Sequence, residues 1–487
     1  MMSPESVQDW LDECFAEIVT RREVPGASVA VLTQDRVITA AAGVLSTATG
    51  VEATTDSVFQ IGSITKLWTS ALVMQLVDDG VIDLDAPLRT YLPGFTVGDA
   101  AASAAITTRQ LLCHVAGFEG DIFTDTGRGS DAVERYLASI RDIPQLFEPG
   151  EVFSYNNTGF VVLGRLVEVL RGKPFDEVLV ERLAAPLGLT HVSPSPYEAI
   201  LHRAAVGHVP GEDGTPVSAP TWALARSNAP AGSMLAMTAR DLLGFVAMHL
   251  ADGSGVLRPG TVAAMWQPQV KVPRLGTMGD SWGLGWEMSE HDGRAVVGHD
   301  GGTIGQAAFL RVVPDHGVAI ALLTNGGDVF GIFDDVLAYL LKELTGIALP
   351  GRPAPRAEPE AIDPTPYLGR YADTITDITV SQDADGAIWL DRVPKGVIAE
   401  IGEKPLRLRL VHFDGDSLIS AEPFRGIHPS SPSSGATRRA SRNTSTTAVW
   451  SPVPEKEPYE SHTHGGPRGP RPDHPDRHGR LRRWRRR

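Results

Sequence analysis

The chain is poor in cysteine, in aromatic residues and in long apolar runs. Two cysteines, Cys14 and Cys113, stand far apart among 487 residues, which excludes a disulfide framework and a cysteine-rich metal cluster. No apolar run approaches the roughly 18 residues that would predict a membrane-spanning helix. The N-terminal segment is acidic and amphipathic and lacks the basic start and apolar core of a secretory signal. We therefore expect a protein of the reducing cytoplasm with no membrane partner.

Negative charge prevails, but not along the whole chain. The net charge is −15. From Gly426 onward, twelve Arg and one Lys oppose three Glu and two Asp, so this segment carries +8 and the residues before it carry −23. An acidic body excludes nucleic acid as the expected partner of the folded part.

The order of helical and strand-like patterns predicts one sheet built from both ends of the first 350 or so residues. Apolar periodicity predicts a helix that starts near Ser63 and further helices over 4–20, 107–115, 157–170, 175–187, 238–250 and 329–344. Residues 26–46 read as two strands joined at Gln34 and Asp35, and 282–323 as an antiparallel meander. The first strands are expected to pair with the last ones, around an inserted helical region.

Composition divides the chain into four segments. Residues 1–348 form the main domain, 349–362 a Pro-rich linker, and 363–425 a small C-terminal β domain, for which we expect a lipocalin-like form. Residues 426–487 cannot bury a core and read as a disordered basic tail; a tail for nucleic acid or a membrane surface is an alternative. A second alternative is a frameshift that replaced the last strands, because out-of-frame GC-rich DNA yields Arg, Pro, Gly, Ser and His.

The stretch F-Q-I-G-S-I-T-K (59–66) places a hydroxyl and an amine three residues apart where an apolar helix begins. Positions i and i+3 share a helix face, so Lys66 would lie beside Ser63. The pair could be an accident of a capped helix, or a nucleophile with its base. The motif S-x-x-K is weak alone, so its meaning depends on partners downstream.

Two later stretches supply such partners. In F-S-Y-N-N-T-G-F (153–160), the Tyr155 phenol could be a general base whose pKa a neighbouring cation lowers, and the Asn157 amide could bind Lys66 and the substrate. The alternative is a packed aromatic and a helix N-cap.

In V-V-G-H-D-G-G-T-I-G (296–305), an edge strand would end at His299, and Gly301 and Gly302 would let a substrate approach the backbone. The Gly302 amide would form an oxyanion hole with the amide of Ser63. The alternative is a Gly-Gly hairpin turn with a surface histidine.

These three motifs, in this order, resemble the serine β-lactamase and penicillin-binding protein superfamily. The resemblance is to the branch of class C β-lactamases, D-alanyl-D-alanine carboxypeptidases and β-lactamase-fold esterases. It rests on S-I-T-K (63–66), Y-N-N (155–157) and H-D-G (299–301), and covers about residues 10–345. Three flanking phrases support it: I-T-T-R-Q-L-L-C-H-V-A-G-F (106–118), P-A-G-S-M-L-A-M-T-A-R-D-L (230–242) and W-G-L-G-W (282–286).

The resemblance implies a fold and a mechanism. The fold is of the α/β (α+β) class, β-lactamase/transpeptidase-like, with an antiparallel sheet flanked by helices and an inserted helical subdomain. Ser63 attacks a carbonyl carbon, Lys66 takes its proton or passes it to Tyr155, and Tyr155 protonates the leaving group. Water then releases the acyl group. The catalytic set is Ser63, Lys66 and Tyr155, and no metal or cofactor is needed.

Departures from the family's pattern bear on the substrate. His299 stands where a lysine is usual, and a mostly neutral histidine binds a substrate carboxylate less well. Asp300 would repel such a carboxylate. We therefore expect a small-molecule ester or amide substrate, with an esterase favoured, a D-stereospecific peptidase or carboxypeptidase second and a β-lactamase third. A catalytically idle binding or assembly protein is the alternative from another class, and the oligomeric state stays open.

The remaining polar and aromatic residues of these stretches have structural interpretations. We expect His114 to be a hydrogen-bonded core histidine and Cys113 a buried thiol without a nucleophilic role. Trp282 and Trp286 either pack in the core or line a substrate groove.

Overall fold

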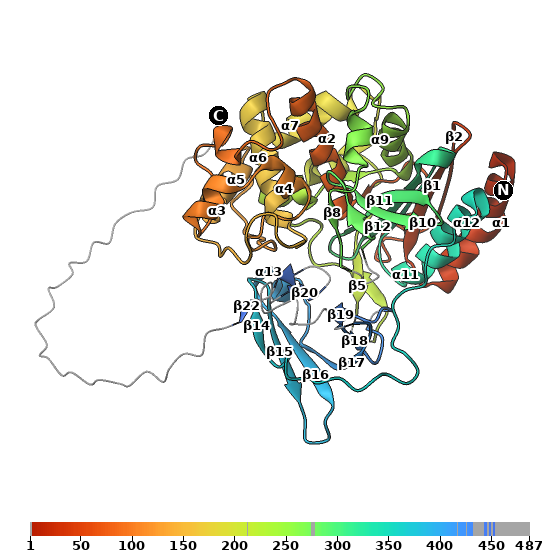
Figure 1. Cartoon of the computed structure of the whole chain (residues 1–487). Coiled ribbons are helices and arrows are strands. Elements are labelled where there is room, and N and C mark those ends of the chain that lie inside the picture. Colours follow the sequence, from red (N-terminus) through yellow and green to blue (C-terminus); the bar gives the residue numbers. More distant parts are fainter. Residues whose placement is uncertain are drawn as a thin grey trace, which may run out of the picture. The chain divides into compact units, whose positions relative to one another are not determined.

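The computed structural model describes residues 2–211, 213–273, 278–415, 417–424 and 426–431, and the backbone of 443–445, 448–449 and 451–452. Its contacts separate residues 1–452 from 453–487, and the expected basic tail lies largely outside the described residues. Figure 1 shows a helical region, a large antiparallel sheet and a second sheet in the C-terminal part. Among the described residues, no helix is long and apolar enough to cross a membrane, and the expected cytoplasmic setting stays a prediction.

The main sheet joins the two ends of the first domain, as the sequence predicts. Its strand order is β2-β1-β13-β12-β11-β10-β9-β8. The strands are β1 (Gly26–Thr33), β2 (Arg36–Gly43), β8 (Val270–Lys271), β9 (Ser281–Trp282), β10 (Glu287–His291), β11 (Arg294–Gly302), β12 (Ala307–Val313) and β13 (Val318–Thr324). The early strand β1 pairs along its length with the late strand β13. Gln34 and Asp35 form the turn between β1 and β2 with positive φ values of 48° and 59°, which a two-residue hairpin loop requires.

Alternating residues of the central strands divide the domain into two cores. Val29 of β1 and Ile320 of β13 pack with α1 (Pro4–Arg21) and α12 (Tyr339–Thr345). Ala30 and Ala321 face the opposite core, which contains α2 (Thr65–Asp78), α6 (Asn157–Arg171) and α9 (Ala239–Leu250). This second core continues into the inserted helical region. Because both faces are covered, β1 and β13 are buried along their length.

The inserted region contains short elements between the main helices. Its helices are α3 (Ala100–Ala105), α4 (Thr108–Leu112), α5 (Ala132–Ser139), α7 (Phe175–Leu179), α8 (Pro196–Ala199) and α10 (Thr261–Met265), and its strands are β3 (Phe59–Gln60), β4 (Val192–Ser193), β5 (His208–Pro210), β6 (Pro216–Ser218) and β7 (Ala236–Met237). The expected helix over 107–115 is shorter, because His114 adopts a positive φ of 57° two residues after α4 ends. The helix expected at 238–250 is confirmed, with Thr238 as its N-cap.

The C-terminal part forms a separate antiparallel sheet with its own small core. The strands are β14 (Gly369–Ala372), β15 (Thr376–Gln382), β16 (Ile388–Pro394), β17 (Leu406–His412) and β18 (Leu418–Ser420), with helix α13 (Gly396–Glu400) after β16. Two short segments beyond residue 425, β19 (Ser430–Ser431) and β22 (Ser451–Pro452), pair with β18 and β14. A two-stranded pair, β20 (Asn443–Ser445) and β21 (Ala448–Val449), lies between them in the chain. The frameshift and lipocalin-like hypotheses stay predictions.

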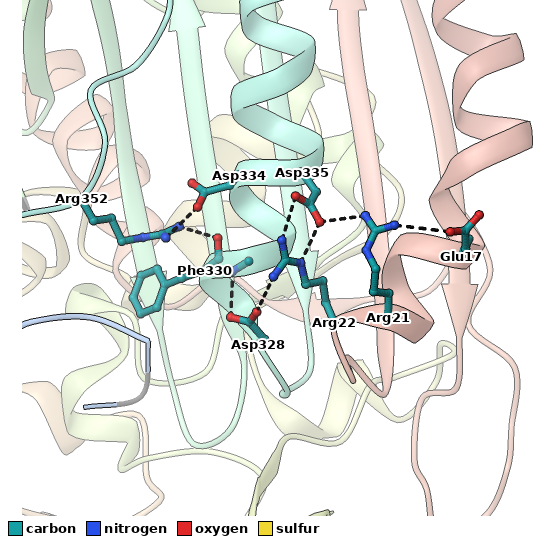
Figure 2. A network of polar contacts seen from close by, with 9 residues as sticks. Glu17, Arg21, Arg22, Asp328, Phe330, Asp334, Asp335 and Arg352 are labelled. Carbon is teal, nitrogen blue, oxygen red and sulfur yellow. Dashed lines mark hydrogen bonds and ion pairs between the residues drawn. The ribbon is translucent and has the colours of Figure 1, made fainter. Parts of the chain in front are cut away.

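A network of ion pairs ties the end of α1 to the start of α11 (Val329–Ile332) and the turns that follow it (Figure 2). Arg22 donates to both oxygens of Asp335, from Nε at 2.7 Å and Nη2 at 2.9 Å, and contacts Asp328 at 3.2 Å. Asp328 also caps α11 by accepting from the Gly331 amide. In the linker, Arg352 pairs with Asp334 at 2.7 Å. The network thereby fixes both ends of the first domain to each other.

We predict that Arg22→Met lowers the free energy of unfolding by about 1 kcal/mol, and the melting temperature with it. This is the value of charged hydrogen bonds, discounted for partial exposure, at about 1 kcal/mol. The Arg22 guanidinium lowers the pKa of Asp335. The stabilisation is therefore complete above the ordinary carboxyl pKa and is lost as the pH falls through the lowered one. Thermal denaturation from pH 7 to pH 3 should show the gap between variant and wild type closing. Arg36→Met, which removes an exposed pair with Glu5, is the control and should change little.

Candidate active site

Ser63 and Lys66 face each other at the start of α2. Ser63 lies in a single 3₁₀ turn, Gly62–Ile64, that runs directly into the helix. The Lys66 Nζ is 3.0 Å from Ser63 Oγ, 2.6 Å from Asn157 Oδ1 and 2.7 Å from the carbonyl oxygen of Ala231. The expected juxtaposition of hydroxyl and amine is present, and Lys66 has its full set of three hydrogen bonds.

The surroundings of Lys66 lower the pKa of its amine. Its side chain is fully buried, and burial lowers its pKa to about 7, although the charge of Asp121 acts in the opposite direction. The carbonyl oxygens of Asn157 and Ala231 can only accept hydrogen bonds. When Lys66 is neutral, its two N–H groups satisfy these oxygens and its lone pair points at the Ser63 hydroxyl.

The two roles that the sequence offered for Asn157, helix N-cap and partner of Lys66, belong to two adjacent asparagines. Asn156, not Asn157, is the N-cap of α6, and its side chain accepts from the Gly159 amide. Asn157 is the first residue of the helix, and its side chain is therefore free to bridge Lys66 and Asp121. The alternative role of Asn157 as an N-cap is wrong.

Tyr155 lies in the same pocket. The Lys66 Nζ lies 5.0 Å from the centre of its ring. Burial raises the pKa of the phenol, and a hydrogen bond with Ser63 only partly opposes this. The expectation that the Tyr155 pKa is lowered is therefore wrong, because desolvation is the largest effect and the charges of nearby carboxylates act in the same direction. Tyr155 carries its proton at neutral pH.

His299 presents an acceptor nitrogen to this pocket. Its Nδ1 is 2.6 Å from the carbonyl oxygen of Asp300, so Nδ1 carries the hydrogen. The other nitrogen, Nε2, lies 3.5 Å from the Tyr155 hydroxyl. Burial and the charge of Lys66 lower the pKa of His299 to about 3. His299 is therefore neutral and supplies no positive charge for a substrate carboxylate.

The sequence suggested that the strand that carries His299 lies at the edge of the sheet. This prediction is wrong. β11 lies between β10 and β12 and continues through Gly302. The opening arises because β10 pairs with β11 only as far as Gly298. Beyond that point, within the part of the chain that the structure describes, residues 299–302 are paired with β12 alone. The side of this short stretch that faces away from β12 has no strand partner among the described residues, and it lies beside the Ser63 turn.

Asp300 does not face the pocket. It pairs across the sheet with Phe309, which belongs to the core with α1 and α12, whereas His299 pairs with Leu310 of the other core. The Asp300 carboxylate binds Arg311 through both oxygens, at 2.5 and 3.1 Å. The expected repulsion of a substrate carboxylate by Asp300 is therefore wrong.

Glycines bring the backbones of three segments into contact around Ser63. A Cβ atom on Gly301 would lie 1.9 Å from the carbonyl oxygen of Ile61, and one on Gly62 would lie 2.6 Å from the Gly302 nitrogen. A Cβ atom on Gly232 would lie 2.2 Å from the Gly62 carbonyl oxygen. Gly301 and Gly302 thus lie against the Ser63 turn, where the oxyanion hole was expected, and that role of Gly302 stays a prediction.

Sequence reasoning missed the polar groups behind this set. Asp121 and Glu119 are buried just beyond the H-V-A-G-F phrase, and no motif marks them. Thr374, in the turn between β14 and β15, donates its backbone N–H to Glu119 Oε1 at 2.7 Å. The Ala231 carbonyl belongs to the phrase P-A-G-S-M, which was noted only as a flanking similarity.

Comparison with known proteins places this geometry in a family. A family model described as Beta-lactamase matches residues 11–341. The chain belongs to the beta-lactamase family. Penicillin-binding protein 4 of Amycolatopsis lactamdurans is 44% identical over 367 residues, which cover 74% of this chain and 96% of that protein.

Two solved structures show the same fold as this beta-lactamase family member. The crystal structure of SurE with D-Leu has a TM-score of 0.69 and 29% identity, and the match covers 88% of this chain and 94% of that one. A class C beta lactamase from Rhodobacter sphaeroides has a TM-score of 0.53 and 20% identity, and covers 67% of this chain and 98% of that one. The first likeness extends past the catalytic domain into the C-terminal sheet.

Aromatic rings support the pocket of this beta-lactamase family member from behind. Trp282 is buried and contacts His299, with ring centres 5.4 Å apart. His114 is stacked against Tyr155 at 4.4 Å, and its Nδ1 accepts the Asn156 amide at 2.9 Å. Trp282, Trp286 and His114 therefore pack in the core, and Cys113, whose pKa burial raises to about 12, is no nucleophile.

We predict that Gly301→Ala lowers the rate of Ser63 acylation at least ~10²-fold, because a misplacement of about 1 Å is enough for such a loss. The new methyl group would displace β11 from the Ile61 carbonyl oxygen. The measurement is the rate of covalent labelling of Ser63 by a fluorophosphonate. Gly94→Ala is the matched control, since a Cβ there meets nothing within 4 Å. An unchanged labelling rate in Gly301→Ala would show that this close approach is not needed.

Proposed function

We propose that this protein is a serine hydrolase that forms an acyl-enzyme on Ser63 with the carbonyl carbon of a D-residue, and cleaves an amide or ester bond. The observation that carries the proposal is the fully buried Lys66, 3.0 Å from Ser63 Oγ and with a pKa near 7. A neutral amine so placed is a general base for the serine hydroxyl.

The roles of the other residues follow from their protonation states. Tyr155 keeps its proton at neutral pH, so it is suited to donate to the leaving group, and the neutral His299 offers an acceptor to its hydroxyl. Lys66, not Tyr155, is then the base that takes the Ser63 proton. Gly301 and Gly302 would let the scissile carbonyl lie against the backbone, with the Ser63 and Gly302 amides as the oxyanion hole. Water activated by the same groups would release the acyl group.

The D-residue is supported by the similar proteins. SurE was crystallised with D-Leu, and the 44% identical relative is a penicillin-binding protein. A neutral His299 supplies no positive charge for a carboxylate and so favours a substrate without a free carboxylate at this strand. These observations favour a D-peptide amide or ester over our first expectation of a simple esterase, which stays a prediction.

We predict that a fluorophosphonate adds one mass equivalent to Ser63, and that Ser63→Ala abolishes the labelling. A panel of p-nitroanilides and p-nitrophenyl esters of D- and L-amino acids, with nitrocefin, then separates the candidate substrates. Turnover of D-derivatives above their L-enantiomers is the expected result. Equal turnover of wild type and Ser63→Ala on every substrate, without labelling, would favour a binding protein over an enzyme.

We predict that kcat/KM rises with pH through about 7, the pKa of Lys66, because the neutral amine is the active form. Lys66→Ala and Tyr155→Phe should each lower the rate by ~10²–10⁴, the usual contribution of general acid–base catalysis. Tyr155→Phe should leave the rise near pH 7 in place, since Lys66 is intact. A pH profile that is flat from 5 to 9 would contradict the assignment of Lys66 as base.

A further inference from the structure

Asp121 is a buried carboxylate that none of the three motifs contains. Its Oδ1 accepts the Asn157 Nδ2–H at 2.7 Å, and Asn157 Oδ1 lies 2.6 Å from the Lys66 Nζ. The three side chains therefore form a continuous hydrogen-bonded row. It runs from the segment that follows α4, across the first residue of α6, to the start of α2.

This row allows only one orientation of the Asn157 amide. The Lys66 ammonium has donors alone, so it needs the oxygen end of the amide. The Asp121 carboxylate accepts alone when ionised, so it needs the nitrogen end. A flipped amide would direct N–H groups at an ammonium and an oxygen at a carboxylate, and both contacts would be repulsive.

We propose that Asp121 is a positioning residue that fixes the Asn157 amide with its oxygen toward Lys66. Its negative charge, one side chain away from the Lys66 amine, also stabilises the ammonium form. The inference rests on the proposed function, since it gives Asp121 a task in the acylation of Ser63. Asp121 does not touch the reacting atoms and acts through Asn157 and through its charge.

The backbone beneath Asp121 is held from two sides. From α6, Thr158 donates its N–H and its hydroxyl to the Gly120 carbonyl oxygen, at 2.8 and 2.9 Å. From the C-terminal sheet, the Thr374 hydroxyl is 3.4 Å from the Asp121 carbonyl oxygen. These contacts place the carboxylate opposite Asn157 independently of the bond that it makes there.

The charges around Asp121 set the sign of its effect. The groups that face it are Lys66 on α2, Glu119 on its own segment, Asp373 in the β14–β15 turn, Tyr136 on α5 and Tyr155. Burial, with the two carboxylates, raises the pKa of Asp121 to about 7, while the charge of Asp121 raises that of Lys66. Loss of the Asp121 charge should therefore make Lys66 easier to deprotonate.

Two substitutions separate the hydrogen bond from the charge. Asp121→Asn keeps an oxygen that accepts from Asn157 but has no charge, and Asp121→Leu removes both. The readout is the second-order rate of Ser63 labelling by a fluorophosphonate from pH 5 to 9. For Asp121→Asn we expect an alkaline plateau within about threefold of wild type. We expect the acid limb to move to lower pH by up to about one unit, because Asp121 is itself only partly ionised below pH 7. For Asp121→Leu we expect a plateau ~10²-fold lower.

The controls distinguish positioning from general damage to the fold. Asp131→Asn and Asp131→Leu change an exposed aspartate that pairs with Arg135, and should leave both plateau and acid limb unchanged. Circular dichroism verifies that each variant is folded. Equal losses in Asp121→Asn and Asp121→Leu with an unmoved acid limb would overturn the proposal. So would a wild-type profile in Asp121→Leu.

A second measurement does not depend on any reaction. The ¹⁵Nζ chemical shift of Lys66, assigned with Lys66→Ala, reports its pKa directly in wild type and in Asp121→Asn. A lower Lys66 pKa in the variant supports the proposal, and an equal or higher one overturns it. If wild type neither labels nor turns over substrate, the proposed function fails, while this titration still decides the role of the Asp121 charge.

Discussion

The structure of the site depends on the burial of one amine. Lys66 is enclosed at the junction of α2, α6 and the segment that contains Ala231, where water cannot solvate its charge. Desolvation lowers the pKa of Lys66, and the charge of the Asp121 carboxylate opposes that shift. The balance leaves the pKa of the amine at about 7.

The fold creates the surroundings of Lys66 by bringing together distant parts of the chain. The pairing of β1 with β13 and the salt bridges of Arg22 close the first domain, and the inserted helices are thereby held over the sheet. Lys66 lies in α2, just after the turn that carries Ser63, α6 begins with the amide that binds Lys66, and β11 lies against the Ser63 turn. No single one of these segments supplies all the hydrogen-bond partners of Lys66. The site therefore exists only in the folded domain.

Much of this arrangement could be predicted from local patterns. The helices at 4–20 and 238–250, the Gln34–Asp35 turn and the order of the three motifs are local signals, and they correspond to elements of the structure. Alternation along a strand could also have predicted that Asp300 points away from His299, because neighbouring strand residues face opposite sides.

Other features depend on contacts that no local pattern contains. Which of two adjacent asparagines caps α6 depends on the position of Lys66, which lies about ninety residues earlier. The direction of the Tyr155 pKa follows from burial, not from the charge beside it. The unpaired side of residues 299–302 depends on where the pairing of β10 with β11 ends. Asp121 and Thr374 have no periodicity or spacing that would single them out, because their partners lie on other segments.

The three glycines that press the Ser63 turn against its neighbours have a consequence for the diversity of such enzymes. Where Gly62, Gly232 and Gly301 meet, main-chain atoms are in such close contact that they leave no volume for side chains. Substitution of residues can hardly change this part of the site. Differences in what such proteins accept must then arise in segments farther from Ser63, while the backbone around Ser63 keeps a fixed form.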